Sequence, residues 1–156
     1  MKMDTVCLEE SLIMVDLDGT TNEEVLQNMA KNLYEQGVVK ESYIDAVIER
    51  EKTYPTGLPT LGCSVAIPHT DIEHVNRKAI SVAVLKKEVD FGIMGEIGTV
   101  TPVKLVFMLA MDQQHAQLKL LQSLMQIFQN EETLNEISRE HRKEKIIDLL
   151  ESKLNH

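Results

Sequence analysis

Residues 105–111 read LVFMLAM, the longest uninterrupted apolar run of the sequence. Seven residues are too few for a membrane span, which needs about 18 apolar residues, and they suit a β-strand that is buried on both faces. A second run of this kind covers residues 79–85, and shorter β-type segments cover residues 13–17 and 63–67. These segments predict the strands of a sheet in the middle of the fold.

Helical patterns lie between and after these strands. Apolar residues recur at helical spacing over residues 25–33, preceded by Thr20 and Thr21, each with a Glu three residues later as in a capping box. Gly37 follows where a left-handed C-terminal cap is common. Further helices are predicted at residues 40–52, at residues 118–128 and, as two helices, within residues 134–154.

The alternation of strands and helices is typical of an α/β layer. We therefore predict an α/β fold, a small mixed β-sheet flanked by helices, in a single domain over residues 1–156. Residues 89–91 form another short β-type segment directly after residues 79–85, and we interpret the two as a hairpin, so that the sheet is not purely parallel. Residues 55–62, rich in Pro and Gly, are predicted to be a loop.

The overall composition excludes two classes of protein. The 156 residues, 43% of them hydrophobic, suit one globular domain, and no segment is long enough to insert into a membrane. The formal net charge is −9, with Lys and Arg scattered along the chain. A nucleic-acid-binding protein needs a basic surface to displace counterions from phosphates, so we exclude nucleic acid as a partner.

The cysteines and the N-terminus predict a cytoplasmic location. Cys7 and Cys63 form no CxxC pair, which suits a reducing compartment better than a disulfide scaffold, and we interpret both as small core residues. Asp4, Glu9 and Glu10 contradict a signal peptide.

His69 is the first candidate for chemistry. It follows a buried-type strand and Pro68, which places its imidazole in a fixed loop at the carboxyl end of a strand, where α/β sheets gather their ligands. An imidazole is mostly unprotonated at neutral pH, because its usual pKa is about 6.5, and it can therefore accept a phosphoryl group and release it again. The alternative is that Pro68 and His69 merely close a loop.

Arg50 and His115 are candidate companions of His69. Arg50 lies near the end of the second predicted helix, and its planar guanidinium can hold two oxygens of a phosphoryl group. Gly57 and Gly62, in the connecting loop, would let backbone N–H groups approach an anion. His115 follows the strand at residues 105–111, so it too stands at a strand's carboxyl end, although an exposed His at a helix start is common.

Neither a metal nor a cofactor is expected. His69, Asp71 and His74 have a spacing that puts no pair on one helical face, unlike the H-E-x-x-H motif. No Walker loop, kinase glycine loop or Mg²⁺-binding carboxylate set is present, so a phosphoryl group must arrive on another protein. His141 and His156 lie in charged surroundings and are predicted to be solvated surface residues.

Three motifs together resemble those of a known family. Residues 50–51, 55–57 and 65–69 resemble the R-E, P-T-G and I-A-I-P-H signature of enzyme IIA of the fructose/mannitol class, a component of the bacterial phosphoenolpyruvate-dependent sugar phosphotransferase system. The resemblance covers roughly residues 12–150. The Tyr54-to-Gly57 form is most similar to the galactitol branch of this class.

The resemblance implies a phosphoryl carrier that functions as a phosphotransferase component. In such proteins the histidine of I-A-I-P-H, here His69, accepts a phosphoryl group from HPr and passes it to a cysteine of a IIB partner, which phosphorylates the sugar during entry through membrane-embedded IIC. Arg50 corresponds to the arginine of R-E and is expected to steady the phosphoryl group. His115 falls where many members carry a second active-site histidine, and the hydroxyl of Thr70 is a possible phosphate contact.

Two other functions fit the same residues. The first is regulatory: a phosphoprotein that controls a transcription factor or a kinase through phosphorylation of His69. The second is a non-catalytic binding module in which Pro68 and His69 have a structural role only. A phosphorylation assay separates the second from the other two.

Overall fold

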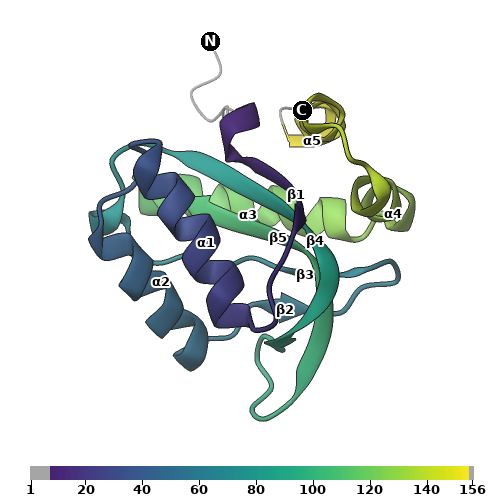
Figure 1. Ribbon diagram of the computed structural model, residues 1–156, viewed down its shortest axis with the longest axis horizontal. Coiled ribbons are helices and arrows are strands. Elements are labelled where there is room, and N and C mark those ends of the chain that lie inside the picture. The colour runs from purple at the N-terminus through teal and green to yellow at the C-terminus, as the bar shows by residue number, and fades with distance from the viewer. Residues whose placement is uncertain (1–7, 155–156) are drawn as a thin grey trace.

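The computed structural model describes residues 8–154 (Figure 1). Five strands form one mixed sheet in the order β1-β4-β5-β3-β2. β1 is parallel to β4 and β3 to β5, whereas β4 and β5, like β2 and β3, are antiparallel. The strands are β1 (Ile13–Leu17), β2 (Gly57–Leu58), β3 (Ser64–Ala66), β4 (Ala79–Gly92) and β5 (Val100–Ala110). The predicted mixed sheet is confirmed.

Helices cover both faces of the sheet. In Figure 1, α1 (Asn22–Glu35) and α2 (Ser42–Thr53) lie in front of it and α3 (Gln114–Phe128) lies behind. Strand β5 shows why two layers form, since its residues alternate between the two hydrophobic cores: Val106 and Met108 face α1 and α2, whereas Phe107 faces the other layer. That layer also contains α4 (Glu131–Arg139) and α5 (Lys143–Leu154). The α/β prediction is confirmed.

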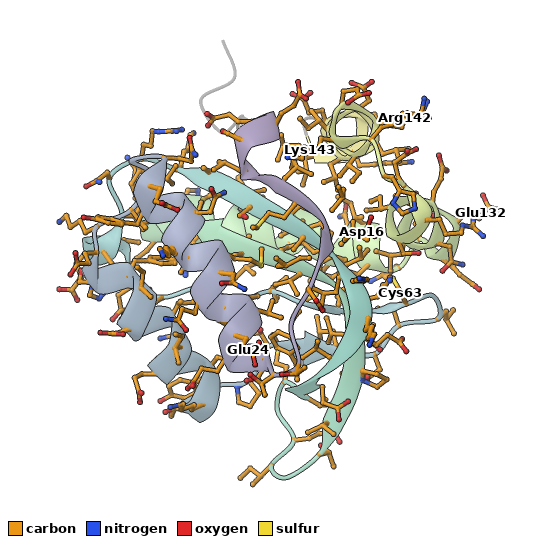
Figure 2. All side chains as sticks on the ribbon, in the orientation of Figure 1. Asp16, Glu24, Cys63, Glu132, Arg142 and Lys143 are labelled. Atoms are coloured by element: carbon orange, nitrogen blue, oxygen red, sulfur yellow. The ribbon has the colours of Figure 1, made fainter. Side chains whose placement is uncertain are left out.

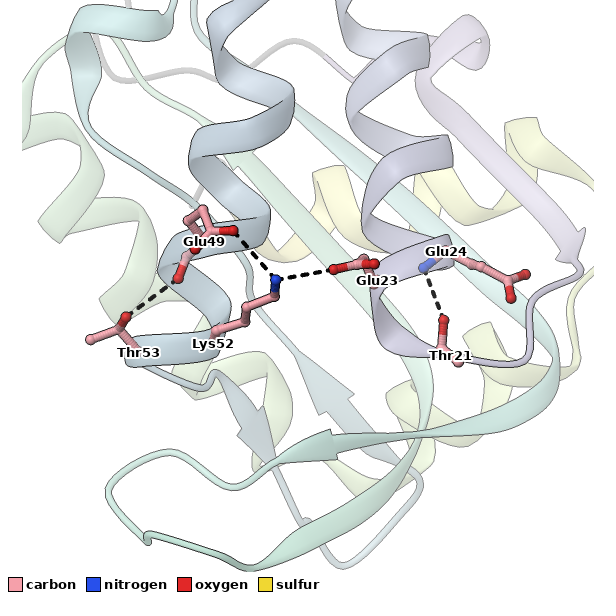
Figure 3. A network of polar contacts seen from close by, with 6 residues as sticks. All are labelled: Thr21, Glu23, Glu24, Glu49, Lys52 and Thr53. Carbon is pink, nitrogen blue, oxygen red and sulfur yellow. Dashed lines mark hydrogen bonds and ion pairs between the residues drawn. The ribbon is translucent and has the colours of Figure 1, made fainter.

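The ends of α1 behave as its sequence predicts, and Lys52 links α1 to α2. Thr21 caps α1, its hydroxyl accepting a hydrogen bond from the Glu24 amide at 3.2 Å, and Gly37 has a φ of 76°. Lys52 Nζ lies 3.2 Å from Glu23 Oε1 and 3.3 Å from Glu49 Oε1, so it joins the last turn of α2 to the first turn of α1 (Figure 3).

The hairpin predicted between residues 85 and 89 is wrong. Residues 79–92 are one strand, β4, whose register against β5 shifts between Val84 and Val89. The intervening residues 86–88 are exposed, but they include no Gly or Asn to make a tight turn. The chain reverses later, after Gly92, and Gly95 and Gly98 in that connection have positive φ values of 78° and 83°.

The loop predicted at residues 55–62 contains a short strand. β2 pairs antiparallel with β3, with Gly57 opposite Ala66. A Cβ atom at position 57 would lie 2.5 Å from the Gly92 carbonyl oxygen, so glycine permits this close approach of two backbones. Two residues are too few to give a periodic pattern, which is why the sequence predicts only a loop here.

The remaining predictions concern cysteines, histidines and membrane spans. Cys63 is partly buried, and its Sγ lies 3.8 Å from the Leu134 carbonyl oxygen of α4; Figure 2 labels it. His141 is exposed, as predicted, with Nδ1 3.3 Å from Asp16 Oδ2. Cys7 and His156 lie outside the described residues. Within residues 8–154, no helix is long and apolar enough to cross a membrane.

Candidate functional site

The loop after β3 carries His69 to the edge of the sheet where β5 also ends. β3 and β5 are parallel, so their carboxyl ends lie at the same edge. The pairing continues beyond β3, because the Leu109 amide donates to the Pro68 carbonyl oxygen at 3.0 Å. The Leu109 carbonyl accepts a 2.6 Å hydrogen bond from the hydroxyl of buried Tyr43 in α2. Leu109 therefore joins α2, β5 and the residue before His69.

One nitrogen of the His69 ring is fixed by the backbone. Nδ1 lies 2.8 Å from the Ile67 carbonyl oxygen. A carbonyl oxygen only accepts hydrogen bonds, so Nδ1 carries the proton in a neutral ring and the lone pair resides on Nε2. Burial lowers the pKa of His69 below its usual value, nearby Arg50 lowers it further, and the Ile67 carbonyl and Asp71 oppose this shift. The ring is therefore a neutral, oriented nucleophile at pH 7.

Arg50 lies in the last turn of α2 and faces the His69 loop. Its Nη1 is 3.8 Å from Asp71 Oδ1, and its guanidinium carbon is 5.2 Å from the centre of the Tyr54 ring. A stacked guanidinium keeps its N–H groups free in its own plane. Asp71 follows His69 by two residues, so the structure brings Arg50 and His69 into one site.

Glu51 and Thr56 form a buried polar pair beneath this site, with 6% and 5% of their surfaces exposed. The Thr56 amide and hydroxyl each donate to a different Glu51 oxygen, both at 2.8 Å. Burial raises the pKa of Glu51 to about 7, and the two hydrogen bonds from Thr56 limit that rise. Both residues belong to the sequence motifs quoted above, but neither was predicted to have a role in the site. No local pattern marks Glu51 as buried, because residues 49, 50, 52 and 53 around it in the last turn of α2 are exposed or half-buried.

His115 stands in the first turn of α3, six residues beyond Leu109, and is exposed. It thus reaches the edge of the sheet that holds His69. Within residues 8–154 it makes no hydrogen bond or ion pair with His69 or Arg50. Thr70 is buried, with 6% of its surface exposed. The structure therefore brings two of the three predicted site residues together and leaves His115 at the same edge.

The residues considered as a metal cluster have other neighbours. Asp71 faces Arg50, and His74 Nδ1 lies 2.8 Å from the Ser42 hydroxyl. In the described part of the chain, no group of three His, Cys, Asp or Glu side chains is placed to hold a metal ion.

Known proteins resemble this chain in sequence. Residues 7–153 match the family model described as "Phosphoenolpyruvate-dependent sugar phosphotransferase system, EIIA 2". The galactitol-specific EIIA component of Escherichia coli (strain K12) is 33% identical over 101 residues, which make up 65% of this chain and 67% of that protein. The transcriptional regulator ManR of Bacillus subtilis (strain 168) is 29% identical over 99 residues, 64% of this chain but 14% of ManR.

A solved structure has the same fold. Enzyme IIA for mannitol, determined in complex with phosphorylated enzyme IIB for mannitol from Escherichia coli, gives a TM-score of 0.77 at 24% identity. The match covers 95% of this chain and 99% of that one. At this identity the likeness establishes the shared α/β sandwich.

Proposed function

The chain belongs to the EIIA 2 family of the phosphoenolpyruvate-dependent sugar phosphotransferase system, and we propose that its His69 receives a phosphoryl group from HPr and passes it to a cysteine of a IIB component. Family membership makes the chain a phosphoryl-carrying transferase component of a sugar system. The observation that supports His69 as the carrier is the 2.8 Å contact between its Nδ1 and the Ile67 carbonyl, beside Arg50.

The proposed step exchanges one P–N bond for another. The Nε2 lone pair of His69 attacks the phosphorus, while the P–N bond of the donor phosphohistidine breaks and its electron pair returns to the donor ring. His69 retains its Nδ1 proton, and the positive charge that the ring gains is stabilised by the Ile67 carbonyl. In the second step a thiolate of IIB attacks the phosphorus, and the P–N electrons return to Nε2. Such transfers need in-line positioning and charge neutralisation above all.

Arg50 and His115 would provide the charge neutralisation. The guanidinium of Arg50 is close enough to His69 to influence its pKa, and it can turn from Asp71 to two oxygens of the phosphoryl group. The Arg50–Asp71 contact is 3.8 Å long, and each of the two side chains is more than a third exposed. Breaking this ion pair therefore costs the protein little stability. His115, at the same sheet edge, would donate a hydrogen bond once the phosphoryl group is present.

The partners follow from the relatives. The mannitol IIA relative was solved with phosphorylated IIB, and we propose a IIB partner for this chain, with IIC reached only through IIB. The 33% identity to a galactitol-specific component favours a sugar alcohol of this kind as the eventual acceptor. We further propose that residues 1–156 act as one cytoplasmic IIA domain without a cofactor, a metal or nucleic acid. The net charge of −9 suits docking to a basic donor surface.

Incubation with phosphoenolpyruvate, enzyme I and HPr, followed by mass measurement of the intact chain, tests the proposal. We expect the mass of one phosphoryl group to be gained by the wild type and by His141→Ala, a control that removes an exposed histidine. His69→Ala should remain unlabelled with an unchanged circular dichroism spectrum. Labelling of folded His69→Ala at the wild-type rate would overturn the assignment.

The similarity to ManR supports the regulatory alternative. Under that alternative His69 is labelled, but the phosphoryl group does not pass on to a IIB cysteine. Adding galactitol-type IIB to the labelled protein separates the two functions, because a carrier loses its label as IIB gains it, and a regulatory phosphoprotein retains it.

A further inference from the structure

A continuous series of hydrogen bonds runs from the core of α2 to the His69 ring. Glu51 accepts from Thr56, the Thr56 hydroxyl accepts from the Ile67 amide at 3.2 Å, and the Ile67 carbonyl contacts His69 Nδ1 at 2.8 Å. Ile67 is buried, so both of its backbone groups are used within the protein. Ile67 precedes His69 by two residues and supplies both the amide that donates to Thr56 and the carbonyl that contacts the ring, so a shift of Ile67 also moves the carbonyl that orients His69.

Each hydrogen bond of this series has a defined direction. The Thr56 hydroxyl has one proton, which it donates to Glu51 Oε1, so its lone pair faces the Ile67 amide. The Thr56 amide donates to Glu51 Oε2, which leaves each carboxylate oxygen with one donor. A carboxylate that accepts on both oxygens fixes the loop residue at the start of β2 against the end of α2. No member of the series can be rotated without leaving a buried polar group unpaired.

We propose that Glu51, acting through Thr56, is a positioning residue that holds the Ile67 carbonyl in place and thereby keeps His69 in the Nδ1-protonated form, with Nε2 directed outward. Glu51 does not touch the reacting atoms, since two residues separate it from the imidazole in the series. Its burial has a cost, since an isolated charged carboxylate is unfavourable in a protein core. The pKa of Glu51 near 7 reflects that cost, and the Thr56 bonds offset part of it.

The state of the His69 ring gives the first test and does not depend on phosphoryl transfer. The ¹⁵N chemical shifts of the two imidazole nitrogens report which one carries the proton. At pH 8, where Glu51 is charged, we expect the wild type to show one dominant form with the proton on Nδ1. Thr56→Val keeps the shape but removes the hydroxyl, and Glu51→Gln replaces one acceptor by a donor. Both variants should shift the nitrogens toward the mixture found in free histidine.

Thr101→Val is the matched control. Thr101 is also 5% exposed, and its hydroxyl makes one hydrogen bond of 2.8 Å, to Ser64 at the opposite end of β3. The Thr101→Val variant thus loses a buried threonine hydroxyl that contacts β3, but it leaves the series of hydrogen bonds intact. The ring shifts of Thr101→Val should equal those of the wild type. Thr56→Ser, which retains the hydroxyl, should do the same.

Labelling by phospho-HPr gives the second test, which rests on the proposed function. We expect the rate at saturating HPr to fall about tenfold in Thr56→Val and Glu51→Gln, with the half-saturating HPr concentration unchanged, because the ring is misoriented and the docking surface is intact. Thr101→Val and Thr56→Ser should label at nearly the wild-type rate.

The two tests fail separately. If the wild type takes no phosphoryl group, the proposed function is contradicted. The ¹⁵N chemical shifts of the His69 ring still test the positioning role of Glu51 in that case. Wild-type ring shifts in both Thr56→Val and Glu51→Gln overturn the positioning role. If circular dichroism shows that Thr56→Val is unfolded, the test rests on Glu51→Gln. An equal loss of labelling rate in Thr101→Val and Glu51→Gln also overturns the proposal, since it indicates a general loss of stability.

Discussion

The loops that follow β3 and β5 reach the same edge of the sheet but are built differently. After β3, the His69 ring is held by the Ile67 carbonyl, and Pro68 is hydrogen-bonded to Leu109 of β5. After β5, the chain enters α3 with His115 exposed in its first turn. A nucleophile needs a lone pair in a fixed direction, whereas a group that only balances charge can be placed as the charge arrives. The two histidines are therefore distinguished by their surroundings and not by their residue type.

The largest difference in phosphoryl uptake should be between the two single alanine variants of His69 and His115. We expect His69→Ala to take no phosphoryl group from phospho-HPr, because it lacks Nε2, the proposed attacking atom, and we expect His115→Ala to remain competent. The adduct on the wild type should be lost in acid and survive in alkali, as a phosphoramidate does. Intact-mass measurement after each treatment checks both expectations, and an acid-stable label would contradict phosphohistidine.

Arg50 should rank next, because it is the cation that faces the His69 loop from the last turn of α2. Loss of a hydrogen bond to a charged group costs about 1.5–3 kcal/mol, so Arg50→Ala should slow transfer roughly 10- to 150-fold. Arg50→Lys keeps the charge but loses the planar fork and should also be impaired. Stopped-flow labelling kinetics measure both, with Lys52→Ala as a control that removes a neighbouring cation. Wild-type rates in Arg50→Ala would exclude Arg50 from the phosphoryl site.

His115→Ala should slow transfer only severalfold, since His69 and Arg50 remain. A His115→Gln variant should transfer faster than His115→Ala, because its amide can still donate a hydrogen bond to the phosphoryl group. The same kinetic assay ranks the three proteins. Identical rates for all three would mean that His115 has no part in phosphoryl transfer.

The titration of His69 should give the smallest but most specific effect. We expect its NMR titration midpoint below the ordinary pKa of about 6.5, since burial and Arg50 disfavour the charged ring. Arg50→Ala should raise this midpoint and Asp71→Asn should lower it, because the two charges act in opposite directions. Since the unfolded chain then binds a proton that the folded chain does not, His69 should make the protein less stable as the pH falls below about 6.5.

Much of the fold could be predicted because it follows from periodic patterns. The buried run at residues 105–111 indicates a central strand, and Thr21 and Gly37 mark the two ends of α1. The errors occur where there is no period. The two residues of β2 are ordered by pairing with β3. Strand β4 runs through the polar residues 86–88 with a shift in register and pairs with β5 again at Val89, which no local pattern indicates.

The site was predictable only in part, for a similar reason. His69 and Arg50 stand out by chemistry and motif. The proposed role of Thr56 depends on contacts with Glu51, five residues before it, and with Ile67, eleven residues after it. Such contacts form when α2, β2 and β3 pack together, and no local pattern encodes them. A buried Glu beside an Arg looks like any charged helix end until the packing is known.

The hydrogen bonds of the Leu109 amide and carbonyl also make hydrogen exchange at Leu109 a measure of how often the His69 loop opens. Its amide can exchange with deuterated solvent only after it separates from the Pro68 carbonyl, a step that lifts the His69 loop from β5. Tyr43 holds the Leu109 carbonyl from α2, so the strand itself stays in place while the loop moves. The exchange rate of this one amide would therefore report the local opening of the loop, separately from unfolding of the whole chain.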